Sequence, residues 1–156
     1  MEFERVMLPE QPYLFVEREC EMSEIGQTMG SAFAELFDFL ARHGIQPQSA
    51  PIAVYPQMPS GSSVRFHCGA FVNPGDLGKA DRLVYGATLP DGPAMKTVHV
   101  GPYANLNQTH QAMWDRITEE DLDGAMPIWE VYVDDPQKTP EAEMRTEVYR
   151  ALSLSR

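Results

Sequence analysis

Two stretches of the chain carry apolar residues at intervals of three to four positions. The first runs through Ile25, Met29, Ala32, Phe33, Leu36, Phe37 and Leu40. The second places Leu106, His110, Met113, Trp114 and Ile117 at the positions of the first five, each 81 residues later. This period is typical of amphipathic helices with one buried face, and Gly44 provides a stop for the first helix.

Runs of β-branched and aromatic residues predict strands on both sides of each helix. In the first half these runs cover residues 12–20, 52–55 and 64–72. In the second half they cover residues 94–100, 127–133 and 144–152, with an Asp-Asp-Pro turn after the middle one. Residues 79–91 are expected to form a bridge between the halves. Each half therefore reads strand, helix, strand, strand.

The match between the halves indicates an internal duplication. Besides the helices, Pro51-Ile52 corresponds to Pro127-Ile128, and Arg65 corresponds to Arg145. A duplicated β-α-β-β unit predicts an α+β fold, with an antiparallel sheet, both helices on one face and a central ligand groove between them. We expect residues 1–156 to form one domain, with half-repeats at about 12–73 and 93–152.

The strand at 127–133 contains a carboxylate among apolar neighbours. Because side chains alternate along a strand, Glu130 and Tyr132 share one face, and Trp129 and Val131 take the other. A solvated strand carboxylate is the ordinary case. A buried one is expensive unless a partner satisfies it. Position 130 has no acidic counterpart in Ile52–Tyr55 of the first half, so we expect the second half to carry the chemistry.

Composition narrows the classes of function. The chain is 43% hydrophobic and 22% charged, as in ordinary globular proteins, with a net charge of −11. This charge argues against direct nucleic-acid binding and permits cationic ligands, although many proteins are acidic simply for solubility. No apolar run approaches the roughly 20 residues that cross a bilayer, and the N-terminus lacks a basic, apolar signal. We therefore expect a cytoplasmic protein without a membrane partner.

Cofactor motifs are missing from the sequence. The four histidines share no metal-ligand spacing, and neither a glycine-rich phosphate loop nor a serine nucleophile elbow occurs. We predict no metal and no cofactor. The oligomeric state is left open.

Three groups of motifs resemble the GyrI-like, or AraC-type, effector-binding domain. The first is the Gly-x-x-Leu-Pro-x-Gly pattern of residues 86–92, and the second is His-Val-Gly-Pro-Tyr at 99–103. The third combines residues 128–136 and 139–141 with Arg-Thr-Glu-Val-Tyr at 145–149. Their order and spacing extend over about 65 residues. The chain departs from the usual pattern at Trp129 and at Ala151.

The resemblance implies two such repeats around a ligand groove. Multidrug-binding members place a buried carboxylate among aromatic rings to receive bulky cationic, apolar compounds. Carried over residue by residue, the motifs imply a site formed by Glu130, Tyr132, Glu147 and Tyr149. Some stand-alone members resemble hydrolases that open strained cyclopropane toxins with that Glu and a Tyr, and others inhibit DNA gyrase.

Each candidate residue has a structural alternative to a functional role. Glu130 in a pocket would pair with a ligand cation or act as a general base that activates water. Four aromatic residues are candidates for core packing or for the ligand site: Phe33, Tyr55, Trp114 and Tyr149. His110 is expected to be a satisfied core histidine, with a proton shuttle or ligand contact as the alternative.

We therefore favour a stand-alone small-molecule-binding protein for apolar or cationic compounds, centred on Glu130. No helix-turn-helix precedes the domain, so it is not expected to read DNA itself. The alternatives are a cofactor-free hydrolase that uses Glu130 with Tyr132 or Tyr149, and a gyrase-inhibitor-like interaction protein.

Overall fold

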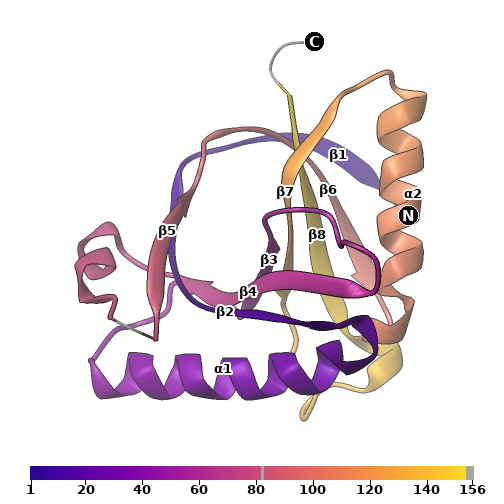
Figure 1. Cartoon of the computed structure of the whole chain (residues 1–156). Coiled ribbons are helices and arrows are strands. Elements are labelled where there is room, and N and C mark those ends of the chain that lie inside the picture. Colours follow the sequence, from indigo (N-terminus) through magenta and orange to yellow (C-terminus); the bar gives the residue numbers. More distant parts are fainter. Residues whose placement is uncertain (82, 154–156) are drawn as a thin grey trace. The chain divides into compact units, whose positions relative to one another are not determined.

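The structure is a computed structural model that describes residues 1–81 and 83–153. Two compact units divide the chain (Figure 1). Glu10–Pro90 form the N-terminal unit, whereas Met1–Pro9 and Asp91–Arg156 form the C-terminal unit. In the described part of the chain, no helix is long and apolar enough to cross a bilayer.

The N-terminal unit is a four-stranded antiparallel arrangement with one long helix. Its strands are β2 (Gln11–Glu21), β3 (Ile52–Tyr55), β4 (Ser63–Phe71) and β5 (Tyr85–Leu89), in the spatial order β3-β4-β2-β5. The helix α1 (Ile25–Arg42) follows a single 3₁₀ turn at Met22–Glu24 and lies along β2 and β4 (Figure 1).

The apolar period of α1 explains the core of this unit. Its buried residues are Ala32, Leu36, Phe39 and Leu40. They meet alternate residues of β2 and β4, among them Leu14, Val16, Phe66 and Cys68. The intervening strand residues point to the face that is turned away from α1. The helix thus covers one face of the strands, and among the described residues the opposite face makes no core contact with it.

The C-terminal unit repeats this plan. Its strands are β1 (Phe3–Leu8), β6 (Gly92–Val100), β7 (Gly124–Tyr132) and β8 (Arg145–Leu152), in the antiparallel order β1-β6-β8-β7. Short 3₁₀ turns occupy Tyr103–Asn105 and Glu141–Glu143, and the helix α2 spans Leu106–Glu119. Three side chains of α2, Leu106, Met113 and Ile117, form a core with Met95, Val148 and Leu152.

The predicted α+β class and the duplication are confirmed. Strands β2, β3 and β4 around α1 have the same order as β6, β7 and β8 around α2. The helices begin at Ile25 and Leu106, which preserves the offset of 81. The central ligand groove stays a prediction.

The main differences from the predicted elements are two additional strands and one strand that begins earlier. Residues 85–89 of the expected bridge form β5, and Phe3–Leu8 form the unpredicted β1. Both are outer strands whose side chains are mostly exposed or partly exposed, so their apolar alternation is weak. The strand expected to begin at Pro127 begins at Gly124, and Pro127 lies inside it behind a cis peptide bond.

The strand register also corrects the expected match of Ile52 with Ile128. That match would make Val54 the counterpart of Glu130. However, Ala53 lies opposite Cys68, a core residue of the unit that contains α1. Glu130 lies opposite Val148, the core residue at the same place in the unit that contains α2. The counterpart of Glu130 is therefore Ala53. The register of β7 on β8 is regular from Ile128 to Tyr132, and its irregularity lies earlier, between Gly124 and Ile128.

Candidate functional site

Glu130 is buried in the C-terminal unit with both carboxylate oxygens engaged. It is 4% exposed and lies opposite Val148, on the face that α2 covers. The Nε2 atom of His110 lies 2.6 Å from Oε2, and the hydroxyl of Tyr132 donates to Oε1 over 2.6 Å. We call His110, Glu130 and Tyr132 the Glu130 cluster.

Local structure brings these three residues together. Glu130 and Tyr132 are two residues apart on β7 and therefore project to the same face. His110 precedes the buried Met113 by three positions on α2, so its side chain lies on the helix surface that meets the strands. His110 is hydrogen-bonded, as expected for a satisfied histidine, but its side chain is 27% exposed and therefore not part of the core. Its role in ligand binding stays a prediction.

The cluster satisfies a carboxylate that burial would otherwise penalise. Hydrogen bonds to a charged acceptor are short and roughly twice as strong as neutral ones, and an unpaired buried carboxylate is strongly unfavourable. The His110 side chain is itself 27% exposed. The imidazole therefore connects the buried carboxylate to solvent and provides a path along which a proton can move.

An additional ring extends the cluster outward. Tyr103, in the 3₁₀ turn before α2, packs edge-on against Tyr132 with ring centroids 5.4 Å apart. Burial raises the pKa of Tyr103, and the charges of Asp134, Asp135 and Glu130 raise it further. Its phenol therefore remains protonated at neutral pH. Tyr103 belongs to the Gly-Pro-Tyr motif, whose spacing alone does not indicate that its ring packs on Tyr132.

A second buried polar group lies on the same face of the unit. His99 Nδ1 is 2.6 Å from the hydroxyl of Thr109, and Nε2 is 3.0 Å from the carbonyl of Pro102. Since a carbonyl only accepts, Nε2 of His99 carries the proton and Thr109 donates to Nδ1 in the neutral ring. His99 is opposite Thr146, which is in turn opposite Tyr132. This polar layer fixes the start of α2 above the Glu130 cluster.

The register separates the other two candidates on β8 from this cluster. Glu147 lies opposite Val131 and Tyr149 opposite Trp129, so both occupy the face turned away from α2. The Tyr149 and Trp129 rings stack at 5.1 Å with an interplanar angle of 4°. The hydroxyl of Tyr149 donates to Glu147 over 2.9 Å. Their roles as ligand contacts stay predictions.

Three aromatic candidates lie elsewhere. Phe33 and Tyr55 are partly buried and pack against the core of the N-terminal unit. Trp114 is 45% exposed on α2, and the guanidinium of Arg150 lies 4.7 Å from its ring centroid. The structure thus groups three of the predicted site residues around Glu130 and two around Tyr149. Among residues 1–81 and 83–153, no three His, Cys, Asp or Glu side chains gather as a metal site.

Comparison with solved structures shows the same fold in several proteins. The EcmrR C-terminal domain superposes with a TM-score of 0.80 at 15% identity, covering 97% of each chain. SAV2435 bound to tetraphenylphosphonium gives a TM-score of 0.67 at 14% identity, covering 99% of this chain and 95% of that one. A hydrolase encoded by lin2189 from Listeria innocua gives 0.65 at 15% identity, covering 97% and 92%.

Sequence comparison identifies the family. No curated protein sequence matches significantly. The profile of the family described as "GyrI-like small molecule binding domain" matches residues 1–152, which is nearly the whole chain. The resemblance of the motifs in the second half is thereby confirmed, and the chain belongs to the GyrI-like small-molecule-binding domain family.

Proposed function

We propose that the protein binds apolar or cationic small molecules at a site centred on Glu130. The observation that supports this proposal most directly is a 4%-exposed carboxylate that is held between a phenol and a partly exposed imidazole. A structural carboxylate needs no route to solvent. This one has a route through His110, which a ligand can displace without moving β7.

The chemistry of the cluster suits an organic cation. An incoming positive charge takes the place of His110 at Oε2, while Tyr132 continues to donate to Oε1. The rings of Tyr132 and Tyr103 offer their faces to the same charge, and a desolvated cation gains about 2 kcal/mol from such a contact. Apolar parts of the ligand pack against these rings.

Tetraphenylphosphonium is a suitable probe, since a protein of the same fold was solved with it. We expect calorimetric titration to show binding that Glu130→Gln weakens at least about tenfold, equal to about 1.4 kcal/mol. Glu119→Gln removes an exposed charge from the same helix as His110 and serves as the control. Equal affinities of the wild type and Glu130→Gln would reject Glu130 as the centre of the site.

A hydrolase is the second candidate, because the cluster pairs a base with a proton path. In this reaction Glu130 removes a proton from water, and the water oxygen attacks an electrophilic ring carbon. The strained ring bond breaks, its electron pair goes to the leaving atom, and that atom takes a proton from Tyr132 or solvent. We assign the assisting phenol to Tyr132, because Tyr149 lies on the other face of its strand pair.

Turnover of a strained ring tests this candidate. With styrene oxide as the probe, we expect Glu130→Gln to abolish diol formation and Tyr132→Phe to lower kcat by about 10²-fold. Tyr149→Phe is the matched control, since it removes a phenol from the opposite face. Undiminished turnover by Glu130→Gln, or an equal loss in Tyr149→Phe, would contradict the assignment.

A further inference from the structure

Arg150 is a basic residue on the face of the C-terminal unit that α2 covers. On β8 it lies opposite Met95 of β6 and opposite Ile128 of β7. Because Met95 belongs to the core under α2, the side chain of Arg150 points toward the helix. The central carbon of its guanidinium lies 4.7 Å from the ring centroid of Trp114. Burial lowers the pKa of Arg150, which means that water solvates its charge poorly.

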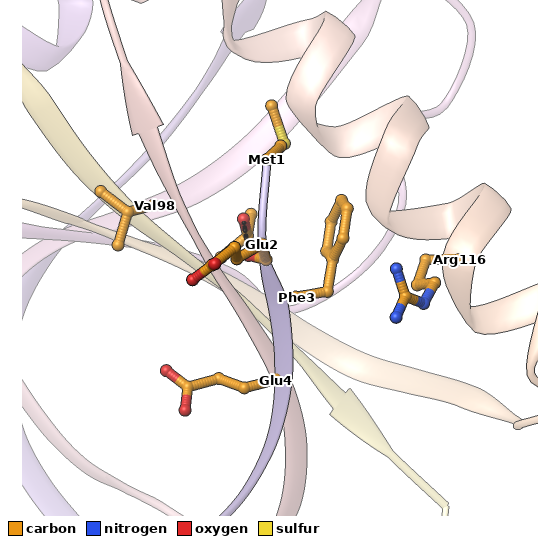
Figure 2. Close-up of a pocket in the computed structure, with 7 residues that line it drawn as sticks. Met1, Glu2, Phe3, Glu4, Val98 and Arg116 are labelled. Carbon is orange, nitrogen blue, oxygen red and sulfur yellow. Dashed lines mark hydrogen bonds between the residues drawn. The ribbon is translucent and has the colours of Figure 1, made fainter.

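A second arginine of this unit, Arg116 on α2, has the same kind of aromatic contact and a carboxylate as well. Its guanidinium lies 5.6 Å from the ring centroid of Phe3, and its Nε donates to Glu120. Figure 2 shows the Phe3 ring and the Arg116 side chain next to each other. Among residues 1–81 and 83–153, six arginines form an ion pair with a carboxylate: Arg5, Arg18, Arg42, Arg65, Arg116 and Arg145. Arg150, the seventh described arginine, has the aromatic ring but no carboxylate.

The nitrogen atoms of Arg150 are not used by the described part of the protein. Nε is buried without a hydrogen-bond partner. The two Nη atoms donate to no residue in 1–81 or 83–153 and are not buried, so both are open to a ligand. A guanidinium carries five N–H donors in a planar fork, and a desolvated charge without a partner is unfavourable. An anion that reaches the Nη atoms removes part of this cost.

A glycine and the indole of Trp114 shape the place that the guanidinium occupies. A Cβ atom at Gly124 would lie 2.8 Å from Nε of Arg150 and 3.2 Å from the Trp114 ring. The glycine therefore leaves the space that the guanidinium and the indole fill together. Trp114 is nevertheless 45% exposed. A positively charged group that is held in place thus has uncovered aromatic surface beside it.

We propose that Arg150 and Trp114 bind the carboxylate of an apolar or aromatic small molecule. The two Nη atoms donate to the two carboxylate oxygens, which is the bidentate arrangement that suits arginine. The apolar body of the ligand packs on the exposed part of the indole. This body is needed for affinity, because a chain with a net charge of −11 repels small free anions. The site selects the opposite charge to the Glu130 cluster and therefore goes beyond the proposed function.

The test compares an aromatic carboxylate with its neutral alcohol. We expect calorimetric titration to show that para-phenylbenzoate binds the wild type at least about tenfold more tightly than para-phenylbenzyl alcohol does. Arg150→Met should remove this preference, since it removes the donors and keeps an apolar side chain. Arg116→Met is the matched control, because it removes a guanidinium that already has an aromatic ring and a carboxylate within the protein. Its affinity for para-phenylbenzoate should lie within about twofold of the wild type.

A second measurement uses the wild-type protein alone. The chain has two tryptophans, and Trp129 lies on the face turned away from α2. We expect para-phenylbenzoate to shift the NMR signal of the Trp114 indole N–H and to leave that of Trp129 unchanged, with the signals assigned from Trp114→Phe. An unshifted Trp114 signal, an equal affinity for the acid and the alcohol, or an equal loss of affinity in Arg116→Met would each overturn the inference.

Discussion

The two units share one scaffold but differ at two of three matched positions that face their helices, and the third position is a tyrosine in both. The N-terminal unit has Met29, Ala53 and Tyr55 at these positions, and the C-terminal unit has His110, Glu130 and Tyr132. Ala53 is fully buried, whereas Glu130 is 4% exposed and bonded on both oxygens. The comparison shows that a buried carboxylate in this scaffold comes with an imidazole partner from the helix.

The faces turned away from the helices differ as well. In the N-terminal unit this face carries aromatic rings around His67. The ring centroids of His67 and Phe15 are 3.8 Å apart, and the hydroxyl of Tyr13 is hydrogen-bonded to Nδ1 of His67 at 2.9 Å. Gly69, opposite Phe15, has no space for a Cβ, which would lie 2.6 Å from the carbonyl oxygen of Leu14 and 3.2 Å from the Tyr13 ring.

In the C-terminal unit this face carries the stacked rings of Trp129 and Tyr149, with Glu147 accepting a hydrogen bond from Tyr149. A histidine ring lies among the aromatic rings in one unit, whereas a tryptophan and a tyrosine stack in the other.

The largest expected effect on stability comes from placing a glutamate at the position of the N-terminal unit that matches Glu130. Ala53→Glu introduces a carboxylate at a fully buried position, in a unit whose helix has Met29 at the position matched to His110. We expect it to lower the free energy of unfolding by about 3–5 kcal/mol at pH 7, the cost of an unpaired buried charge. Urea denaturation measures this effect.

Ala53→Leu is the control, since it overpacks the same position without charge and costs about 1–3 kcal/mol. Burial would raise the pKa of the carboxyl group that Ala53→Glu introduces, so its penalty should shrink as the pH falls toward about 4. Equal destabilisation by the two substitutions at pH 7 would contradict the comparison.

The second prediction concerns substitutions that make the Glu130 cluster apolar, like the matched positions Met29 and Ala53 of the N-terminal unit. His110→Met alone leaves Oε2 of Glu130 without its partner, and we expect a loss of about 3 kcal/mol. Glu130→Leu combined with His110→Met should recover most of that loss, because a buried pair replaced by apolar residues is close to neutral. A double-mutant cycle in urea measures the coupling. A double variant less stable than His110→Met would show that the pair acts through other contacts.

Much of the scaffold could be predicted from the sequence because it follows from periodicity. The helices, the inner strands and the repeat rest on apolar residues that must be buried, so Ile25 and Leu106 mark the helix starts correctly. The outer strands β1 and β5 were missed, since half-exposed strands impose no clear alternation. That Ala53, rather than Val54, is the counterpart of Glu130 follows from strand pairing across each sheet, which the matching Pro-Ile sequences do not reveal.

For the candidate site, the sequence predicts only which residues of one strand share a face. Alternation places Glu130 with Tyr132 and Glu147 with Tyr149, as observed. Which pair faces the helix depends on the register between β7 and β8, and that register is set by pairing across the sheet.

The third prediction concerns pH and the aromatic face of the N-terminal unit. Burial lowers the pKa of His67 from its ordinary value, while the hydrogen bond and charge of Glu17 oppose this shift. Between the folded and unfolded pKa values the unfolded chain binds more protons. The stability contributed by the neutral ring is therefore complete above about pH 6.5 and is lost as the pH falls below it.

We expect urea denaturation to show stability decreasing from pH 7.5 to 5.5, with a slope of at most about 1.4 kcal/mol per pH unit from this residue. His67→Gln should flatten that slope. The lowered pKa values of Asp81 and Asp134 act only below about pH 4, outside this range. An unchanged slope in His67→Gln would assign the pH dependence to other groups.

The smallest effect is expected where matched helix positions hold different aromatic residues. Phe33 stacks near Phe37 along α1, whereas Trp114 lies under the Arg150 guanidinium. Burial lowers the pKa of Arg150, which means that its charge is poorly solvated, and the indole face compensates for part of this cost. Trp114→Leu should therefore lower the free energy of unfolding by about 0.5–1 kcal/mol. In the Arg150→Met background the same substitution should cost less, because the charge that the indole stabilises is gone. Equal costs in both backgrounds, measured by urea denaturation, would show that Trp114 contributes by apolar contact alone.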